Sequence, residues 1–419
     1  MKILIVSTYD TLGGAARGAY SIHEGLLQKG FDSTMLVRRK VSNDPKVISL
    51  ENSFSVFKYK LIQKIETRWF SKYKNRSKTK FSTSLFANTK IAKKINQLKP
   101  DVVHMQWVAD GLITYKDFKK IKAPIVWTLR DMMPFTGGCH YTEGCIKFET
   151  NCGSCPILKS AQEKDLSHKV FKVKKKALEK VSKDKMSFTG ISKWVTDEGK
   201  KSTLLNKYEG YYIPNIIDSQ LYIPKDKEAS RKKLGLPLDK KLVLFGAIGA
   251  KTDPRKGYKY LAKAIEKIDA EDIAAVTFGG KTKGIETIEN TVCHNFGFIN
   301  DDEMLTDLYS AADVMVVPSL QEAYGKTVGE AMSCGTPVVA FDEGGPKDII
   351  DHNINGYLAE LCNSDDLKKG ILWILNHKNP KLLSEEARKK IVEKFHTDSV
   401  IEQYTNVYKK MFNQTKVVN

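Results

Sequence analysis

The chain has 419 residues, too many for one ordinary hydrophobic core, so we expect two domains. Hydrophobic residues make up 41% and charged residues 28%, as in a soluble globular protein, and no apolar run approaches the roughly 18 residues of a membrane-spanning helix. The formal net charge of +19 indicates an anionic partner: nucleic acid, nucleotide phosphates or an acidic membrane surface.

The N-terminus holds one Lys and a short apolar run, Ile3 to Val6, which is too short for a signal peptide and predicts a buried first strand. We therefore expect a cytoplasmic protein whose seven cysteines are reduced or bound to metal. Apolar runs then alternate with helical patterns, the first helix covering about 16–29, which predicts a parallel sheet with helices on both faces. These runs lie at 2–6, 33–38, 101–107, 124–129, 187–192 and 211–218.

A charged segment punctuated by Pro and Gly, near 221–241, predicts a linker and a short helix, after which the series restarts. The second set of apolar runs lies at 241–249, 274–280, 295–299, 313–319 and 336–342. The fold class is therefore α/β, with two doubly wound Rossmann-like domains, 1–218 and 219–399, and a final helix within 400–419 that packs back on the first domain. We expect the two domains to face a central cleft and to bind ligands at the carboxyl ends of their strands.

The loop after 313–319 contains the most informative segment of the chain. Gly325 permits a close approach of the backbone, and the free N–H groups near Lys326 to Gly329 would face a phosphate. Glu322 and Glu330 flank this point, where carboxylates would repel a phosphate. We infer that they accept hydrogen bonds from ribose or sugar hydroxyls instead.

The segment Glu322-Ala-Tyr-Gly-Lys-Thr-Val-Gly-Glu330 resembles the E-x7-E signature of retaining glycosyltransferases of family 4, which have the two-domain GT-B fold. The likeness continues in "GGAARGAYSIHEGL" at 13–26, "PNIID" at 214–218, "RKGYKYL" at 255–261 and "LYSAADVMVVPS" at 308–319. The resemblance implies that Glu330 binds the nucleotide ribose and that Glu322 lies at the donor sugar. The alternative is that both are ordinary charges near a helix start.

The resemblance also implies an Arg and a Lys that neutralise the departing diphosphate. The Lys corresponds to Lys256, whereas the usual Arg position holds Ala247, so Arg255 is the candidate for the second cation. The alternative for both cations is a solvated turn. The full set of candidate donor-binding residues is Glu330, Gly13, Gly14, Arg17, Gly325, Lys326, Thr327 and Phe298.

Gly13 and Gly14 open a helix, so their backbone could approach a phosphate, with Arg17 one turn later; a plain tight turn is the alternative. At the end of the strand 124–129, relatives often have His-Asp where this chain has Arg130-Asp131. Asp131 remains a catalytic candidate, although in the resembled family the leaving phosphate can itself accept the proton.

The ends of neighbouring strands supply His104, Gln106 and Trp107. His104 could face a ligand or be a core histidine bonded to a carbonyl.

Cys139, Cys145, Cys152 and Cys155 fall within 17 residues with the spacing C-x5-C-x6-C-x2-C. Four thiolates with a terminal C-x2-C suit a structural zinc ion. Reduced cysteines that pack a loop, or two disulfides, are the alternatives.

Residues 58–80 carry nine Lys or Arg and one Glu. Leu61, Ile62, Ile65, Trp69 and Phe70 have nearly helical spacing, which predicts an amphipathic helix that could lie on an anionic membrane. A solvated helix packed on the first domain is the alternative, and nucleic acid is a weaker one because no binding motif accompanies the charge.

Together these features predict a retaining glycosyltransferase of the hexosyltransferase type that needs no divalent metal. It would move sugar from a nucleotide-sugar to a glycan or lipid-linked glycan at the inner face of the membrane. Family habit suggests bacterial capsule, exopolysaccharide or O-antigen synthesis. The competing hypotheses are a sugar-nucleotide epimerase of the same fold and a basic binding module without enzymatic activity.

Overall fold

A computed structural model describes residues 1–87, 90–246, 249, 251–268 and 271–418. The chain forms two compact units, Met1–Pro214 with Val400–Asn419 (unit 1) and Asn215–Ser399 (unit 2). The boundary precedes the predicted position at 218 because the intervening residues bond to unit 2. Ile217 N donates to Phe395 O (2.9 Å), and Tyr324 Oη donates to Asn215 O (3.0 Å).

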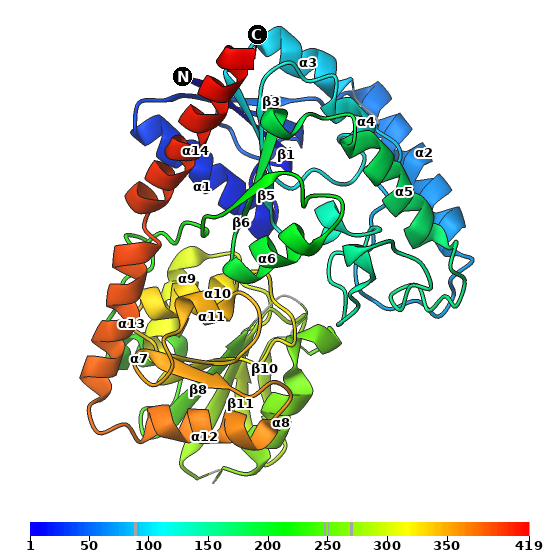
Figure 1. The fold of residues 1–419 in the computed structure, drawn as a ribbon. Helices are drawn as coiled ribbons and strands as arrows, with labels where there is room; N and C mark the ends of the chain where they lie inside the picture. The colour runs from blue at the N-terminus through cyan, green and yellow to red at the C-terminus, as the bar shows by residue number, and fades with distance from the viewer. Residues whose placement is uncertain (88–89, 247–248, 250, 269–270, 419) are drawn as a thin grey trace. The chain divides into compact units, whose positions relative to one another are not determined.

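Unit 1 is built on a seven-stranded sheet in the order β3-β2-β1-β4-β5-β6-β7, in which every neighbouring pair is parallel (Figure 1). Its strands are β1 Lys2–Tyr9, β2 Asp32–Arg39, β3 Val47–Ser49, β4 Val102–Met105, β5 Ile125–Leu129, β6 Met186–Gly190 and β7 Glu209–Tyr212. Its longer helices are α1 Gly14–Gln28, α2 Ser53–Phe70, α3 Ile91–Leu98, α5 Leu166–Leu178, α6 Lys193–Lys201 and α14 Thr397–Val418, with α4 a single turn at Tyr115–Phe118.

Unit 2 contains a second seven-stranded sheet, in the order β10-β11-β9-β8-β12-β13-β14, in which only β10 runs antiparallel to its neighbour. The strands are β8 Lys241–Gly246, β9 Ile273–Phe278, β10 Gly284–Ile288, β11 Thr291–Asn295, β12 Val314–Val317, β13 Val338–Phe341 and β14 Gly356–Ala359. The helices are α7 Lys227–Leu234, α8 Tyr258–Glu266, α9 Asp302–Ala311, α10 Lys326–Ser333, α11 Pro346–Ile349, α12 Ser364–Leu375 and α13 Pro380–Lys394.

Continuous apolar runs become strands that are buried on both faces, because helices cover both sides of each parallel sheet. In unit 2, α8 and α12 form one apolar layer with the strands, and α10 packs on β12 and β13 with α9 beside it (Figure 1). The predicted fold class, two doubly wound α/β domains, is confirmed.

One predicted strand is wrong. The run 295–299 was expected to be a strand, but β11 ends at Asn295 and the following residues form a loop. The backbone stays beside the end of β9 for two more residues, since Phe296 N donates to Thr277 O (2.8 Å) and Gly279 N donates to Gly297 O (2.7 Å), and Gly297 adopts a positive φ of 66°. Phe298 is consequently 62% exposed instead of packed in the core.

Each sheet reverses its strand order once, between β1 and β4 in unit 1 and between β8 and β12 in unit 2. At such a switch point the loops after two adjacent parallel strands diverge and leave a crevice at their carboxyl ends. In unit 2 the loop after β8 leads to Arg255 and Lys256, and the loop after β12 contains Glu322. The topology therefore brings these three charged residues together.

Candidate active site

Glu322 and Lys256 form a close ion pair at the switch point of unit 2. Lys256 Nζ donates to Glu322 Oε2 (2.6 Å), and Arg255 Nη1 lies 3.6 Å from the same oxygen. Burial by itself would raise the pKa of Glu322, but the two cations and hydrogen bonding outweigh it and hold the pKa below its ordinary value. Glu322 is thus an ionised carboxylate at neutral pH.

Arg255 is largely committed to the loop that carries Glu322. Its Nη1 also donates to Gln321 O (2.8 Å), and its Nη2 donates to Asp253 Oδ2 (3.0 Å). The side chain thereby braces the two loops of the switch point. The position of the usual family cation, Ala247, lies outside the described residues.

Gly257 explains how Lys256 comes so close to the Glu322 loop. This glycine has a φ of 71°, and a Cβ placed on it would lie 1.7 Å from Pro318 O. Leu320 N also donates to Arg255 O (2.8 Å), so the backbones of the two loops touch directly. Only glycine permits this approach.

Two further glycines, Gly344 and Gly345, hold the Glu322 loop from another side. Gly345 N donates to Glu322 O (2.8 Å), and a Cβ on Gly344 would lie 2.4 Å from that carbonyl. A Cβ on Gly345 would lie 2.4 Å from Tyr324 Cα. Backbone packing around Glu322 therefore requires the two glycines of the GGP sequence at 344–346.

Glu330 lies in α10 and is 4% exposed. Tyr309 Oη donates to its Oε2 (2.8 Å), and Lys326 Nζ lies 3.0 Å from its Oε1. Tyr309 is itself completely buried, so its hydroxyl holds the Glu330 carboxylate from within the core. Lys326, one helical turn earlier, lies beside the same carboxylate. The sequence patterns did not identify Tyr309, because its partner becomes visible only when α9 packs beside α10.

The start of α10 presents three further predicted donor-binding residues. Gly325 is the N-cap residue and has a φ of 87°, with Lys326 and Thr327 in the first turn, both partly exposed. Phe298 lies in the exposed loop after β11, and nothing in the described contacts joins it to Glu330.

The glycine turn of unit 1 is open. Gly13 has a φ of 86° and caps α1, and a Cβ added at Gly13 or Gly14 would have no neighbour within 4 Å. Arg17 follows one turn into the helix and is partly buried. The turn therefore leaves room for a ligand beside the α1 N-terminus, although packing alone does not require glycine at Gly14.

Asp131 belongs to a buried hydrogen-bonded chain in unit 1. His140 Nδ1 lies 2.7 Å from Asp131 Oδ2, and His140 Nε2 lies 2.8 Å from Ser82 Oγ. Trp107 Nε1 also donates to Asp131 Oδ2 (2.9 Å). Burial acts to raise the pKa of Asp131, but its contact with His140 and its hydrogen bonds lower it.

The carboxylate of Asp131 is therefore fully engaged, so it orients His140 instead of acting as a free base. His140 and Ser82 were not singled out as functional from the sequence. An antiparallel bridge between Phe81 and Cys139 brings them together, and no short motif indicates it.

His104 is a core histidine, the alternative left open by the sequence. It is completely buried, with Nε2 2.6 Å from Thr128 Oγ1 and Nδ1 2.7 Å from Tyr408 Oη of α14. Burial lowers its pKa well below the usual value, so the ring is neutral. Gln106 also turns inward and accepts from Arg130 Nε (2.9 Å).

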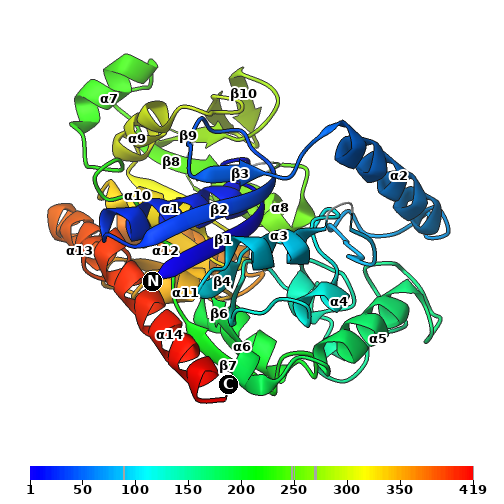
Figure 2. The ribbon, with the colours of Figure 1, turned by 90° about the horizontal axis from the view of Figure 1, so that it is seen from above.

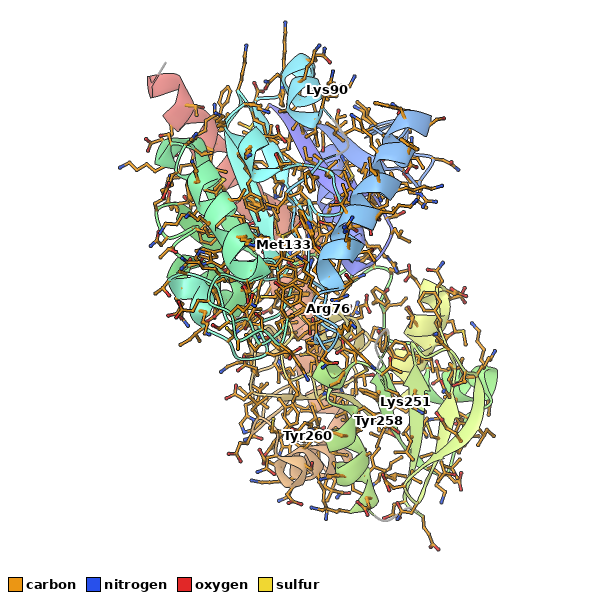
Figure 3. All side chains as sticks on the ribbon, turned by 90° about the vertical axis from the view of Figure 1, so that its right-hand side faces the viewer. Arg76, Lys90, Met133, Lys251, Tyr258 and Tyr260 are labelled. Carbon is orange, nitrogen blue, oxygen red and sulfur yellow. The ribbon has the colours of Figure 1, made fainter. Side chains whose placement is uncertain are left out.

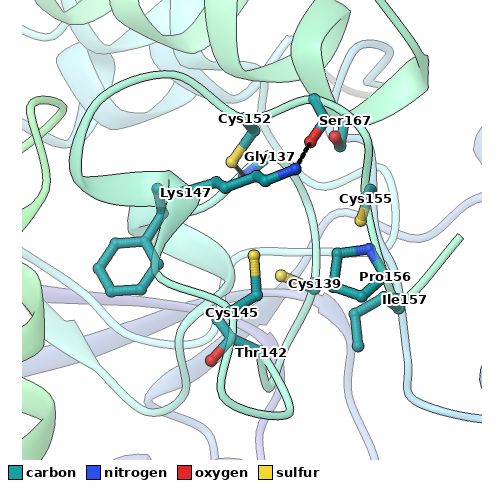
Figure 4. A pocket seen from close by; sticks show the side chains of 12 residues that line it. Gly137, Cys139, Thr142, Cys145, Lys147, Cys152, Cys155, Pro156, Ile157 and Ser167 are labelled. Atoms are coloured by element: carbon teal, nitrogen blue, oxygen red, sulfur yellow. Dashed lines mark hydrogen bonds between the residues drawn. The ribbon is translucent and has the colours of Figure 1, made fainter. Parts of the chain in front are cut away.

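The four clustered cysteines line one pocket of about 20 Å³ (Figure 4). All are free thiols, so the alternative of two disulfides is not met. Within the described part of the chain, no three His, Cys, Asp or Glu side chains are placed to hold a metal ion, so the structure does not support the predicted zinc site. Cys139 and Cys155 instead join an apolar cluster with Phe81 and Leu166, and burial raises the pKa of both thiols.

A buried lysine beside this pocket should give the protein an unusual pH dependence. Lys174 Nζ donates to Met133 O (2.5 Å) and Thr136 O (3.0 Å). Burial nevertheless lowers its pKa to about 7. An unfolded lysine titrates near 10.4, so between about pH 7 and pH 10 the unfolded chain binds more protons and this residue makes stability rise by up to about 1.4 kcal/mol per pH unit.

Lys174→Met should remove that contribution. The free energy of unfolding in urea, measured across this pH range, should rise less or fall more steeply with pH in the variant than in the wild type. Lys172→Met, on the exposed side of the same helix, should keep the wild-type slope. Equal slopes for the wild type and Lys174→Met would show that Lys174 stays charged in the fold.

Comparison with solved structures identifies the architecture. Sucrose-phosphate synthase from Thermosynechococcus elongatus superimposes with a TM-score of 0.66 at 17% identity, over 99% of this chain and 100% of that one. Anabaena HepE in complex with UDP and glucose gives 0.63 at 16% identity, over 97% and 99%. Such identities establish the fold alone, which is that of the GT-B glycosyltransferases.

Part of the chain also matches a family by sequence. Residues 226–394, which lie within unit 2, match the family described as glycosyl transferases group 1. An uncharacterized glycosyltransferase of Methanocaldococcus jannaschii is 32% identical over 195 residues, 44% of this chain and 49% of that protein. The N-acetyl-alpha-D-glucosaminyl L-malate synthase of Bacillus anthracis is 25% identical over 205 residues, 47% and 52%. The chain thus spans about half the length of these relatives.

Proposed function

We propose that this protein is a glycosyltransferase that binds a nucleotide-sugar donor in unit 2. The observation that carries the proposal is the arrangement at the switch point, where Glu322 and Glu330 each lie beside a lysine. A bound donor would replace these internal ion pairs. Its diphosphate would accept a hydrogen bond from Lys256, and its hydroxyls would donate to the carboxylates of Glu322 and Glu330. The group 1 glycosyltransferase domain covering this segment supports the same function.

We infer that transfer proceeds with retention of configuration, as the E-x7-E segment suggests. The acceptor oxygen would bond to the anomeric carbon while the bond to the diphosphate oxygen breaks, and the acceptor proton would pass to the diphosphate. Lys256 would stabilise the charge that develops on this leaving group. The steps assigned to these residues need no divalent metal.

Unit 1 is proposed to bind the acceptor at the carboxyl ends of β1 and β4. There the rings of Tyr9 and Trp107 stack with centroids 6.5 Å apart, and Lys80 Nζ lies 4.3 Å from the Trp107 ring centroid. Aromatic faces of this kind can cover a sugar ring, and the cation suits an acidic or phosphorylated acceptor. A glycan or lipid-linked glycan of a bacterial surface polysaccharide, receiving a hexose, is the proposed substrate class.

Thermal unfolding in the presence of UDP-, GDP-, TDP- and ADP-sugars tests the donor site. We expect one nucleotide class to raise the unfolding midpoint of the wild type. Glu330→Ala should lose most of this shift, because a charge-assisted hydrogen bond contributes roughly 1.5–3 kcal/mol, about tenfold to a hundredfold in affinity. Glu330→Gln can still accept the hydrogen bond from Tyr309. It therefore distinguishes a loss of donor binding from a loss of folding stability.

The matched control is Glu385→Ala, which removes a 61% exposed carboxylate from α13 of the same unit and should leave the shift unchanged. If folded wild-type protein responded to no nucleotide-sugar, or if Glu330→Ala responded as fully as the wild type, the proposed donor site would be wrong.

A further inference from the structure

The helix α2 carries an exposed face that combines apolar and cationic side chains. Phe54 and Phe57 are each 66% exposed and Leu61 is 50% exposed. Their spacing of three and four residues puts them on one side of the helix. Lys58, Lys60, Lys64 and Arg68 are exposed along the same helix.

This face differs from the predicted one. The sequence pattern placed the apolar stripe at Leu61 to Phe70, but Ile62 is buried, and Trp69 and Phe70 pack inward against Phe86 and Phe81. Because α2 begins at Ser53, the exposed stripe includes two aromatic residues that precede the basic segment 58–80.

The inner face of α2 is firmly attached to unit 1. The Arg38 guanidinium lies 4.2 Å from the Tyr59 ring centroid, and Thr83 donates a hydrogen bond to Glu66. The helix begins with a capping box in which Asn52 and Ser55 each bond to the other's backbone. The outer face is consequently held in place without contributing to the core, and Figure 2 shows α2 standing off the sheet of unit 1.

The charged residues of the segment 53–80 are cationic with one exception. Glu66 is the only acidic residue in 53–80, and its carboxylate is bonded inward to Thr83. Exposed cations continue past the helix at Lys72, Lys74 and Arg76, the last of which is labelled in Figure 3. The Arg76 guanidinium lies 4.9 Å from the Phe70 ring centroid. Exposed aromatics flanked by cations are the pattern of helices that lie in the interface of an anionic bilayer.

We propose that the outer face of α2 docks on a bilayer surface that contains anionic lipid. Phe54, Phe57 and Leu61 would enter the boundary between head groups and acyl chains, while the lysines and Arg68 contact lipid phosphates. No described helix has both the length and the apolar character needed to cross a bilayer, so docking would be peripheral. Docking would not require a bound donor, so it can be tested separately from transferase activity.

Cosedimentation with phosphatidylcholine vesicles, with and without phosphatidylglycerol, tests the proposal on the full chain. We expect binding only when phosphatidylglycerol is present, and weaker binding at higher salt. Replacing Phe54, Phe57 and Leu61 together with Ser should reduce binding at least about tenfold. Replacing Lys58, Lys64 and Arg68 together with Gln should reduce it similarly.

Two control variants match these changes. Ile285→Ser with Val292→Ser removes exposed apolar residues from β10 and β11 of unit 2 and should leave vesicle binding unchanged. Lys169→Gln, Lys172→Gln and Lys176→Gln together remove three exposed charges from α5 of unit 1, a helix whose apolar residues are buried apart from the partly buried Val173. This triple variant should retain most of the binding.

Three results would overturn the proposal: no binding of the wild type to anionic vesicles, full binding by the Ser variant, or equal losses in the α5 control. Binding to single-stranded DNA but not to vesicles would instead identify a nucleic-acid surface. The nucleotide-sugar thermal shift of the α2 variants should equal that of the wild type. A negative result for membrane docking would therefore not contradict the proposed donor site.

Discussion

Lys256→Met should reduce kcat by roughly a hundredfold to a thousandfold, the usual cost of removing one group that stabilises developing charge. Lys256 Nζ is held 2.6 Å from Glu322 Oε2, so the cation is already positioned before the donor binds. Arg255 cannot readily replace it, since its guanidinium braces Gln321 and Asp253. Transfer to an acceptor, or slow hydrolysis of the donor, would provide the rate once the nucleotide is known.

The same variant should change the pH dependence of activity in a defined direction. Burial acts to raise the pKa of Glu322, whereas Lys256 and Arg255 lower it, with Lys256 having the larger effect of the two cations. Without Lys256 the pKa of Glu322 should rise, so the acidic limb of the pH–rate profile should move to higher pH. An unmoved limb would show that Glu322 is not the group that titrates there.

Lys256→Arg should retain part of the activity because it keeps the charge, and Lys263→Met removes an exposed lysine of α8 as a control. If Lys256→Met turned over donor as fast as the Lys263→Met control, Lys256 would have no role in leaving-group stabilisation.

Gly257→Ala should destabilise the fold by roughly 2–5 kcal/mol, the sum of a left-handed backbone penalty and overpacking. Its φ is 71°, and the new Cβ would lie 1.7 Å from Pro318 O, a backbone atom that cannot move aside alone. The clash would push the Lys256 loop away from the Glu322 loop, so donor binding should weaken in the fraction that remains folded. Urea unfolding and the nucleotide-sugar thermal shift measure the two effects.

Gly235→Ala is a matched control for backbone strain. Gly235 also lies in unit 2 with a φ of 65°, but a Cβ there would have no neighbour within 4 Å. This variant should lose only about 1–2 kcal/mol from the left-handed conformation and should bind donor normally. Equal losses for the two variants would show that contact with Pro318 contributes nothing.

The sequence predicted the fold class because parallel strands buried on both faces must be continuous apolar runs. It located Glu322, Glu330 and Lys256 for a different reason, since these residues stand in ordered motifs at strand ends. The helix entry at Gly325 was also readable, because a residue before a helix that needs positive φ is usually glycine.

The remaining site residues depend on contacts between distant segments. Tyr309 approaches Glu330 only through packing of α9 on α10, and His140 meets Ser82 across a bridge of two loops. His104 lies near the end of the buried strand β4 and Gln106 follows it, where ligand-binding residues often stand, yet both turn inward to polar partners. When a strand is buried on both faces of its sheet, the local sequence does not indicate whether such a residue points into the core or toward a ligand.

The sequence by itself determined two α/β domains, the carboxylate motif and the strong positive charge, because periodicity, composition and short spacings are local properties. Only the tertiary structure decided that Lys256 reaches Glu322, that Cys139 and Cys155 join an apolar cluster, and that Phe54 and Phe57 face outward. Each of these outcomes depends on which surfaces are buried against one another, and burial is settled by packing between segments far apart in the chain.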